Sequence, residues 1–197
     1  KIYEDICFFY PNTYLFPSKE IVFYNIDAIS GDLRWERLKV LREIVRQSKK
    51  IIVTAVDNLT SWYIPIELYK AYTFKITLGQ QLNLDDILVK LIESGYERIS
   101  TVLLKGQFSI RGGILDIFPP ASSSPYRIEL FGDEVDSIRT FNIETQKSID
   151  KVQSVEVFPA KELILKKENI EKGIEKIYKD YKDQQAIFSS KKDREKL

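Results

Sequence analysis

The stretch from Gly106 to Arg139 constrains the fold of this chain more than any other part of its sequence. It has the sequence GQFSIRGGILDIFPPASSSPYRIELFGDEVDSIR, in which short runs of alternating apolar and polar residues are separated by residues that favour turns. Such alternation is typical of β-strands that bury one face. The stretch therefore predicts a twisted antiparallel sheet, and we expect a docking surface on it rather than a catalytic pocket.

The strands around this stretch are predicted from the same alternation. They are expected at Phe74–Thr77, Ser100–Leu104, Gln107–Arg111, Ile114–Phe118, Tyr126–Phe131 and Val135–Phe141. Gly112–Gly113 shifts the alternation by one residue, as a bulge or a tight turn would. Gly132–Asp133 is a hairpin turn signal. These strands predict a small, mostly antiparallel sheet.

A helix is predicted between the first two of these strands. Asn83 is expected to cap its N-terminus and Gly95 to end it. Its buried stripe should consist of Leu88, Leu91 and Ile92. This helix is expected to pack on the sheet.

The residues before Phe74 predict part of an α/β layer. A helix should run from its N-cap, Asp32, to about Gln47. Its core face is expected to carry Trp35, Leu38, Leu41 and Val45. Ile21–Tyr24 is expected to be extended, and the apolar run Ile51–Val56 is typical of a parallel strand that is buried on both faces. After Pro159, the spacing of apolar residues predicts an amphipathic helix over Asn169–Gln185.

The composition excludes several functional classes. The chain has no histidine, so serine–histidine and cysteine–histidine nucleophile pairs and histidine metal ligands are excluded. The lone Cys7 excludes an internal disulfide and a thiolate zinc site, and it is expected to be a small core residue. No glycine-rich phosphate loop and no apolar run of the ~20 residues that a membrane span needs is present. No signal peptide is visible, and a cytosolic setting fits; Lys1 at the start indicates a trimmed chain.

The strand Tyr126–Phe131 carries the most informative candidate residues. One face is predicted to carry Arg127, Glu129 and Phe131, so that a large ring lies among charges. Arg111 is expected to approach this face from a neighbouring strand. An aromatic residue flanked by arginines is typical of an interface hot spot. In the alternative interpretation, Phe131 lies under its turn or a helix, and both arginines are solvated or paired with Glu129.

The carboxylates of the same region allow an enzymatic alternative. Asp116, Asp133, Glu134 and Asp136 are candidates for acid–base work or magnesium binding. However, acidic residues crowded at a hairpin commonly serve turn geometry. Asp116 lies inside an apolar strand and is expected to pair with an arginine or to cap a backbone group.

DNA binding is a further alternative. The basic pairs Lys166–Lys167 and Lys191–Lys192 are candidates for phosphate contacts. Acidic residues are interleaved with them, and the formal net charge is only +1. The charge pattern therefore favours a solvated helix face over a general DNA-binding surface.

Four segments carry a family resemblance. They are GYERIS (Gly95–Ser100), GQFSIRGGILDIFPP (Gly106–Pro120), YRIELFGDEVDSIRTFNIETQKS (Tyr126–Ser148) and VEVFPA (Val155–Ala160). In this order they resemble the N-terminal module of the bacterial transcription-repair coupling factor family, which is similar to the excision-repair protein UvrB. The runner-up is UvrB itself, but no glycine-tipped, tyrosine-rich hairpin is visible among the aromatic residues 8–30.

The resemblance implies a fold and a domain organisation. Residues 1–72 would be a partial UvrB-like domain 1a with a RecA-like α/β layer. Residues 73–158 would be domain 2, an α+β domain that binds UvrA, and residues 159–197 the start of a helical domain 1b. The implied fold class is α/β plus α+β, with a C-terminal amphipathic helix.

The resemblance also implies a function. This chain would be a non-catalytic adaptor without a cofactor that recruits UvrA, the damage-recognition ATPase of nucleotide excision repair. In family members, ATP and magnesium serve a downstream motor that translocates on double-stranded DNA and displaces stalled RNA polymerase. The residues implied to contact UvrA are Arg111, Arg127, Phe131, Asp133 and Glu134, and Gly112 and Gly113 would shape the sheet beside them.

Overall fold

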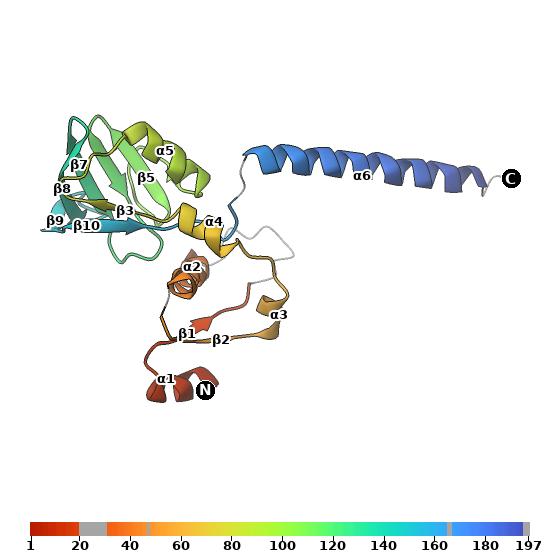
Figure 1. Ribbon diagram of the computed structural model, residues 1–197, viewed down its shortest axis with the longest axis horizontal. Helices are drawn as coiled ribbons and strands as arrows, with labels where there is room; N and C mark the ends of the chain where they lie inside the picture. The colour runs from red at the N-terminus through yellow and green to blue at the C-terminus, as the bar shows by residue number, and fades with distance from the viewer. Residues whose placement is uncertain (20–30, 47, 165–166, 195–197) are drawn as a thin grey trace. The chain divides into compact units, whose positions relative to one another are not determined.

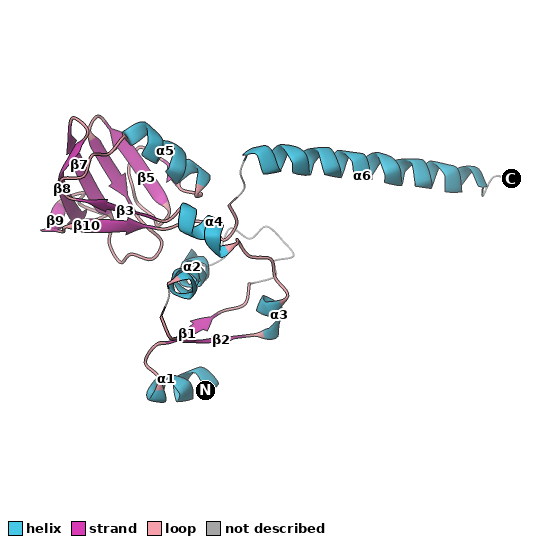
Figure 2. Ribbon diagram, viewed as in Figure 1, coloured by secondary structure: helices cyan, strands magenta, loops and turns pink. Residues whose placement is uncertain are grey.

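The computed structural model describes residues 1–19, 31–46, 48–164 and 167–194, and the chain forms two compact units, residues 1–164 and 165–197 (Figure 1). It combines helices with mixed sheets and ends in a long helix (Figure 2). The α+β character and the C-terminal helix predicted from the sequence are therefore confirmed. Within the described part of the chain, no helix has both the length and the apolarity needed to cross a membrane.

The elements follow one another along the chain as labelled in Figure 1. The helices are α1 (Ile2–Phe9), α2 (Gly31–Val45), α3 (Val56–Leu59), α4 (Ile66–Ala71), α5 (Leu84–Glu93) and α6 (Lys167–Arg194). The strands are β1 (Thr13–Phe16), β2 (Ile51–Thr54), β3 (Phe74–Thr77), β4 (Glu97–Arg98), β5 (Gln107–Arg111), β6 (Ile114–Ile117), β7 (Tyr126–Phe131), β8 (Glu134–Phe141), β9 (Ser148–Lys151) and β10 (Ser154–Val157).

The largest sheet has six strands in the order β4-β5-β6-β7-β8-β9. All its neighbouring strands pair antiparallel except β4 and β5, which are parallel. The predicted strands at β3 and β5–β8 are confirmed to within one residue at each end. The alternation predicted them well because it is a local signal of one buried and one open face.

The predicted strand Ser100–Leu104 is wrong, because this segment is irregular. The side chain of Gln107 accepts hydrogen bonds from the backbone N–H groups of Leu103 and Leu104 at 3.1 and 2.8 Å. These bonds take the place of ladder bonds to a neighbouring strand. The parallel partner of β5 is instead the two-residue strand β4.

Two glycine turns determine how β5–β6 and β7–β8 join. Arg111 pairs with Ile114 and Phe131 pairs with Glu134, so each loop has two residues. The first loop residue is Gly112 in one hairpin and Gly132 in the other, with φ of +58° and +61°. The second residue has no positive φ, which is the pattern of a type II′ turn. Gly112–Gly113 is therefore a tight turn, one of the two predicted possibilities.

The main core lies between the six-stranded sheet, the β3–β10 pair and α5. Asn83 caps α5 as predicted, since its Oδ1 accepts from the backbone N–H groups of Asp85 and Asp86. Gly95 follows the helix with φ of +90°, as expected for its end. Leu91 is fully buried as predicted.

The predicted buried stripe of α5 is wrong at one position. Ile92 is 53% exposed, while Ile87 is buried with Leu91 and Leu88 is half-buried. Ile87 and Leu91 are four residues apart and thus lie above one another on the helix. Ile92 follows Leu91 by one residue, which is about 100° around the helix, so its side chain does not lie in line with Ile87 and Leu91.

The first 72 residues contain a β–α–β arrangement. The strands β1 and β2 are parallel, with Thr13 opposite Ile51, and α2 lies between them in sequence. The parallel pairing was predicted, but burial of Ile51–Val56 on both faces was wrong, because β2 is half-buried throughout and the strand ends at Thr54. Only one neighbouring strand, β1, pairs with β2 among the described residues. The predicted extended segment Ile21–Tyr24 lies outside the described residues.

The buried face of helix α2 agrees with the sequence prediction, but its N-terminus does not. Leu38 and Leu41 are buried, and Trp35 and Val45 pack against the same cluster, as predicted. Asp32 lies within the helix, which already begins at Gly31, so its prediction as N-cap is wrong.

The predicted core position of Cys7 is also wrong, because Cys7 is half-buried in α1, a helix without buried residues.

Contacts from α2 and from Arg46, the residue that follows it, bind the β1–β2 region to the main core. Arg34 donates from Nη2 to the carbonyl oxygen of Ala160 at 3.0 Å. Arg46 forms an ion pair with Glu156 at 2.5 Å. Residues 1–164 therefore form one compact unit rather than two independent ones.

The guanidinium of Arg37 donates four hydrogen bonds within this unit. It is only 2% exposed and contacts Glu162 through Nε at 2.6 Å and Nη2 at 3.0 Å. Its Nη1 donates to Asn58 Oδ1 at 2.9 Å and to the carbonyl oxygen of Pro17. The ring of Phe16 lies beneath it at 4.2 Å. This network links β1, α2 and α3 with the segment that follows β10.

We expect the stability of the chain to fall in acid because of Glu162. Burial would raise the pKa of this carboxyl, but the hydrogen bonds and charges of Arg37 and Lys19 outweigh burial and lower the pKa. The resulting stabilisation is complete above the pKa of an unperturbed glutamate, about 4.3. It is lost as the pH falls below that value through the lowered pKa of the folded state.

Urea unfolding between pH 3 and pH 7 tests this expectation, with Glu162→Gln as the comparison. The variant should show a weaker decrease in the free energy of unfolding between about pH 5 and pH 3. Equal decreases in both proteins would contradict a role for this carboxylate.

Helix α6 forms the second unit and is described by itself. It spans Lys167–Arg194, so the predicted helix Asn169–Gln185 is confirmed and extends further at both ends. Its apolar residues recur at three- and four-residue spacing, and these are Ile170, Ile174, Ile177 and Tyr181.

Candidate protein-docking surface

The strand β7 places its side chains alternately on the two faces of the sheet. Ile128 is fully buried in the main core, whereas Arg127, Glu129 and Phe131 lie on the opposite face. The pairing with β8 shifts at Glu129–Leu130, where Ser137 and Val135 are the successive partners. The extra residue of this bulge is Asp136 of β8, so the alternation of β7 continues uninterrupted to Phe131. The predicted face is thereby confirmed.

Asp116 connects the two predicted arginines. It pairs with Arg127 in the ladder and is only 1% exposed. Arg127 donates from Nε to Oδ1 at 2.7 Å and from Nη2 to Oδ2 at 2.9 Å. Arg111 donates from Nη2 to the same Oδ2 at 3.1 Å. The expectation that Asp116 pairs with an arginine is confirmed, and the structure brings two arginines to one carboxylate.

The guanidinium of Arg127 is held from several sides. Besides its two bonds to Asp116, Nη1 donates to the carbonyl oxygen of Gln146 at 3.2 Å. The ring of Phe141, itself buried, lies 4.8 Å from the guanidinium carbon. The hydrogen bonds that Arg127 donates to Asp116 raise the pKa of Arg127 above its usual value. Arg127 therefore presents a fixed guanidinium whose remaining N–H groups point away from Asp116.

The alternative in which Arg111 and Arg127 pair with Glu129 is wrong, although the charge of Glu129 contributes to the raised pKa of Arg127. Glu129 accepts from Ser137 Oγ at 2.6 Å and pairs with Arg139 at 3.5 Å. On this face, three arginines thus share two carboxylates. The side chain of Arg111 is 55% exposed, while that of Arg127 is 17% exposed.

Phe131 is 85% exposed, so the alternative in which a turn or a helix covers its ring is also wrong. Its backbone is nevertheless well fixed, because it pairs with Glu134 across the two-residue turn. The preceding residue, Leu130, donates its N–H to the carbonyl oxygen of Gly113 at 2.8 Å. A β-carbon at Gly113 would lie 2.9 Å from the carbonyl oxygen of Leu130, so glycine allows the two hairpins to approach. A large apolar ring is thus displayed on a rigid support.

Asp133 and Glu134 lie at the tip of the β7–β8 hairpin with exposed side chains. The tip is anchored through its backbone, since Leu82 donates to the carbonyl oxygen of Asp133 at 2.7 Å and Gln81 bridges to Glu134. We name Arg111, Arg127, Phe131, Asp133 and Glu134 the docking surface. Arg111 comes from β5 and Arg127 and Phe131 come from β7, the two strands that flank β6. Asp133 and Glu134 come from the β7–β8 turn and the first residue of β8.

The enzymatic alternative has no converging group of carboxylates in the described part of the chain. There, no cluster of three or more Asp, Glu, His or Cys side chains has a geometry that could hold a metal ion. Asp116 is occupied by two arginines, and Asp133, Glu134 and Asp136 belong to the turn or the bulge beside it. The arrangement of these carboxylates suits contact with a partner better than catalysis.

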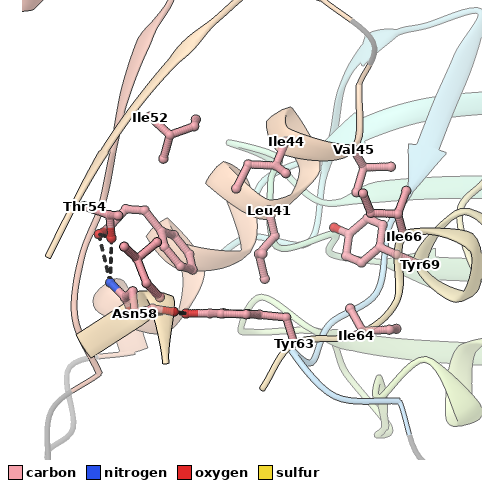
Figure 3. Close-up of a pocket in the computed structure, with 12 residues that line it drawn as sticks. Leu41, Ile44, Val45, Ile52, Thr54, Asn58, Tyr63, Ile64, Ile66 and Tyr69 are labelled. Atoms are coloured by element: carbon pink, nitrogen blue, oxygen red, sulfur yellow. Dashed lines mark hydrogen bonds between the residues drawn. The ribbon is translucent and has the colours of Figure 1, made fainter. Parts of the chain in front are cut away.

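A second feature, which the sequence did not predict, is an apolar pocket of about 420 Å³ between α2, β2 and α4 (Figure 3). Leu41, Ile52 and Ile64 are among the residues that line it. Its polar groups mostly bond to one another, as Figure 3 shows for Asn58, which donates to Thr54 Oγ1 at 2.8 Å. Tyr69 is the exception, since its buried hydroxyl has no hydrogen-bond partner among the described residues. The other lining side chains are mostly apolar.

Residues 74–163 match the family model described as the UvrB interaction domain. The chain is also 40% identical over 163 residues to the transcription-repair-coupling factor of Bacillus subtilis (strain 168), which covers 83% of this chain and 14% of that relative. It is 36% identical over 157 residues to the protein of the same description from Staphylococcus aureus (strain USA300), covering 80% of this chain and 13% of that relative. The corresponding protein of Staphylococcus epidermidis is 37% identical over 158 residues, again 80% of this chain and 13% of the relative.

These similarities confirm the resemblance predicted from the sequence, and they do not favour UvrB itself. The chain spans about a seventh of the length of the curated relatives it matches. The docking surface lies entirely within the residues that match the UvrB interaction domain.

Proposed function

We propose that this chain is a UvrA-recruiting adaptor module of a transcription-repair coupling factor, the family whose members it matches over 80% or more of its length. The docking surface contacts UvrA, and the chain brings that damage-recognition protein to the site of repair. No catalytic step and no cofactor belongs to this chain in the proposal.

The observation that carries the proposal is the exposed ring of Phe131 on the same face of the sheet as two arginines, within the domain matched by the family model. Aromatic and arginine side chains are the residue types enriched at interface hot spots. The fork of an arginine suits paired oxygen acceptors. We therefore expect the UvrA surface to offer carboxylates or carbonyls to Arg111 and Arg127 and an apolar site to Phe131.

The domain organisation in the proposal follows the resemblance. Residues 1–72 are part of domain 1a, whose β1–α2–β2 unit we take as a portion of a RecA-like layer. Residues 73–158 are domain 2, and residues 159–197 begin domain 1b. The parallel pairing of β1 with β2 around an intervening helix supports the first assignment, because parallel strands need such a crossover.

The longer proteins of this family supply the remaining activities in the proposal. A motor outside this chain binds ATP and magnesium, moves on double-stranded DNA and displaces stalled RNA polymerase. The setting is the bacterial cytoplasm, where transcription and repair take place. The adaptor itself needs neither nucleotide nor metal.

Calorimetric titration of the chain with purified UvrA tests the proposed function. We expect micromolar or tighter binding by the wild-type chain. Arg127→Ala should weaken binding by at least about tenfold, because truncating an interface hot spot typically costs about 2 kcal/mol or more and about 1.4 kcal/mol is already tenfold. Circular dichroism before each titration establishes that the variant is folded.

Arg98→Ala is the matched control, since Arg98 is an exposed arginine of the same sheet that lies outside the docking surface. It should bind UvrA like the wild-type chain. Absence of binding by the wild-type chain would overturn the adaptor function. Equal weakening by both substitutions would instead indicate a general attraction of positive charge.

A further inference from the structure

Asp116 is an unusual group to find beneath a surface that uses arginines for docking. Its carboxylate is 1% exposed and accepts three hydrogen bonds, all of them from Arg111 and Arg127. On its other side in the ladder lies Ser109, whose hydroxyl donates to the carbonyl oxygen of Ser100 at 3.1 Å. The carboxylate is therefore reserved for the two arginines and out of reach of a partner.

The charge of Asp116 and its geometry predict opposite effects on binding. As a charge, it partly cancels the positive field of the docking surface, which would weaken attraction to acidic acceptors. As a geometric constraint, it fixes two long side chains that otherwise have many rotamers. Fixing them before the encounter reduces the entropy that is lost on association.

The geometry points to the second effect. Arg127 donates from Nε to Asp116 and from Nη1 to the carbonyl oxygen of Gln146, and the face of its guanidinium packs on the ring of Phe141. Together these contacts select one orientation of the guanidinium. Arg111, which comes from a different hairpin strand, meets Arg127 only through Asp116 Oδ2. A single buried oxygen thus determines how the two guanidinium groups lie relative to one another.

We propose that Asp116 is a positioning residue of the docking surface: it holds Arg111 and Arg127 in the orientation in which they contact the partner. This inference rests on the proposed function and concerns a residue that does not itself reach the partner. It predicts that removing a negative charge from a basic docking surface weakens binding, although electrostatic attraction alone would strengthen it.

Asp116→Asn tests this inference, because it keeps the size of the side chain and removes its charge. We expect affinity for UvrA to fall by about tenfold, the effect of losing a typical anchor residue. In the Arg127→Ala background the same substitution should change affinity little, since its main target is already absent. Glu129→Gln is the matched control: it makes the same charge change on the same face, yet Glu129 bonds to Ser137 and Arg139 rather than to the two docking arginines. It should bind UvrA as well as the wild-type chain or better.

A measurement without the partner separates this inference from the proposed function. In nuclear magnetic resonance spectra of the free chain, the Nε–H signal of Arg127 should be sharp and protected from exchange, and Asp116→Asn should abolish that protection. If Arg127 stays equally protected in the variant, the positioning role is overturned whatever UvrA does. If the wild-type chain binds UvrA and Asp116→Asn binds equally well or better, the positioning role alone fails. If the wild-type chain does not bind, the proposed function fails with it.

Arg127→Lys keeps the inference testable should Asp116→Asn unfold. Lysine retains the charge but lacks the fork that makes two parallel bonds to Asp116. Binding weaker than that of the wild-type chain by about tenfold is expected. Wild-type affinity in this variant would overturn the positioning role, because a charge without fixed orientation would then be sufficient.

Discussion

Replacing Arg37 with alanine is expected to lower the free energy of unfolding by about 3–5 kcal/mol, the typical effect of removing one partner of a buried ion pair. Arg37 is 2% exposed, and the substitution removes the side-chain donor to the carbonyl oxygen of Pro17. It also removes donors to Glu162 and Asn58, which keep only Lys19 and Tyr63, respectively, among the described residues. It also removes the cation from the face of the Phe16 ring. Urea unfolding followed by tryptophan fluorescence measures the loss.

Lys39→Ala provides the control, because Lys39 is an exposed basic residue of the same helix. Its substitution should change the free energy of unfolding by no more than about 0.5 kcal/mol, as at most exposed positions. A loss below about 1 kcal/mol in Arg37→Ala would show that water replaces the buried contacts, as it does for exposed pairs. In that case, the network would not be what joins the β1–β2 region to the rest of residues 1–164.

The local parts of the fold could be predicted from the sequence. The strands β5–β8 followed from period-two alternation, and their hairpins followed from glycines that the turns require. The prediction of a strand at Ser100–Leu104 was wrong because the side chain of Gln107 accepts from backbone N–H groups there, in place of a neighbouring strand. The alternation of apolar and polar residues does not reveal such a side-chain acceptor. The prediction that Ile92 is buried was wrong because the width of the buried stripe on a helix depends on the surface it packs against, which the spacing of apolar residues does not show.

The long-range parts could not be predicted. Arg37 and Glu162 are 125 residues apart in sequence, and nothing local distinguishes Arg37 from the other arginines of α2. The apolar pocket and the buried hydroxyl of Tyr69 arise in the same way, from packing of α2, β2 and α4. Such contacts depend on tertiary structure, which a single sequence does not display.

The docking surface was predictable to an intermediate degree. Alternation placed Phe131 and Arg127 on one face, and the sequence alone suggested that Arg111 would join them. That Asp116 would bind both arginines was not predicted, because it depends on the register of β5, β6 and β7 together. The roles of these residues in binding UvrA remain predictions.

Two phenylalanines of the same sheet are expected to respond to alanine substitution in opposite ways. Phe108→Ala should lower the free energy of unfolding by about 3–5 kcal/mol, because its fully buried ring leaves a cavity in the main core. Phe131→Ala should change it by no more than about 0.5 kcal/mol, since the ring is 85% exposed. Its affinity for UvrA should instead fall by about 2 kcal/mol or more, roughly thirtyfold. Urea unfolding and calorimetric titration of each variant measure the two quantities.

Trp62→Ala is the control for exposure, because Trp62 is 88% exposed and lies outside the docking surface. It should affect neither quantity. If Phe131→Ala destabilised the chain as much as Phe108→Ala, the exposed position of its ring would be wrong and lost binding would only report lost folding. If it changed neither stability nor affinity, the ring would be an ordinary exposed apolar residue, as many are. A loss of affinity without a loss of stability would show that the exposed ring serves a partner, because an exposed ring does not stabilise the folded chain.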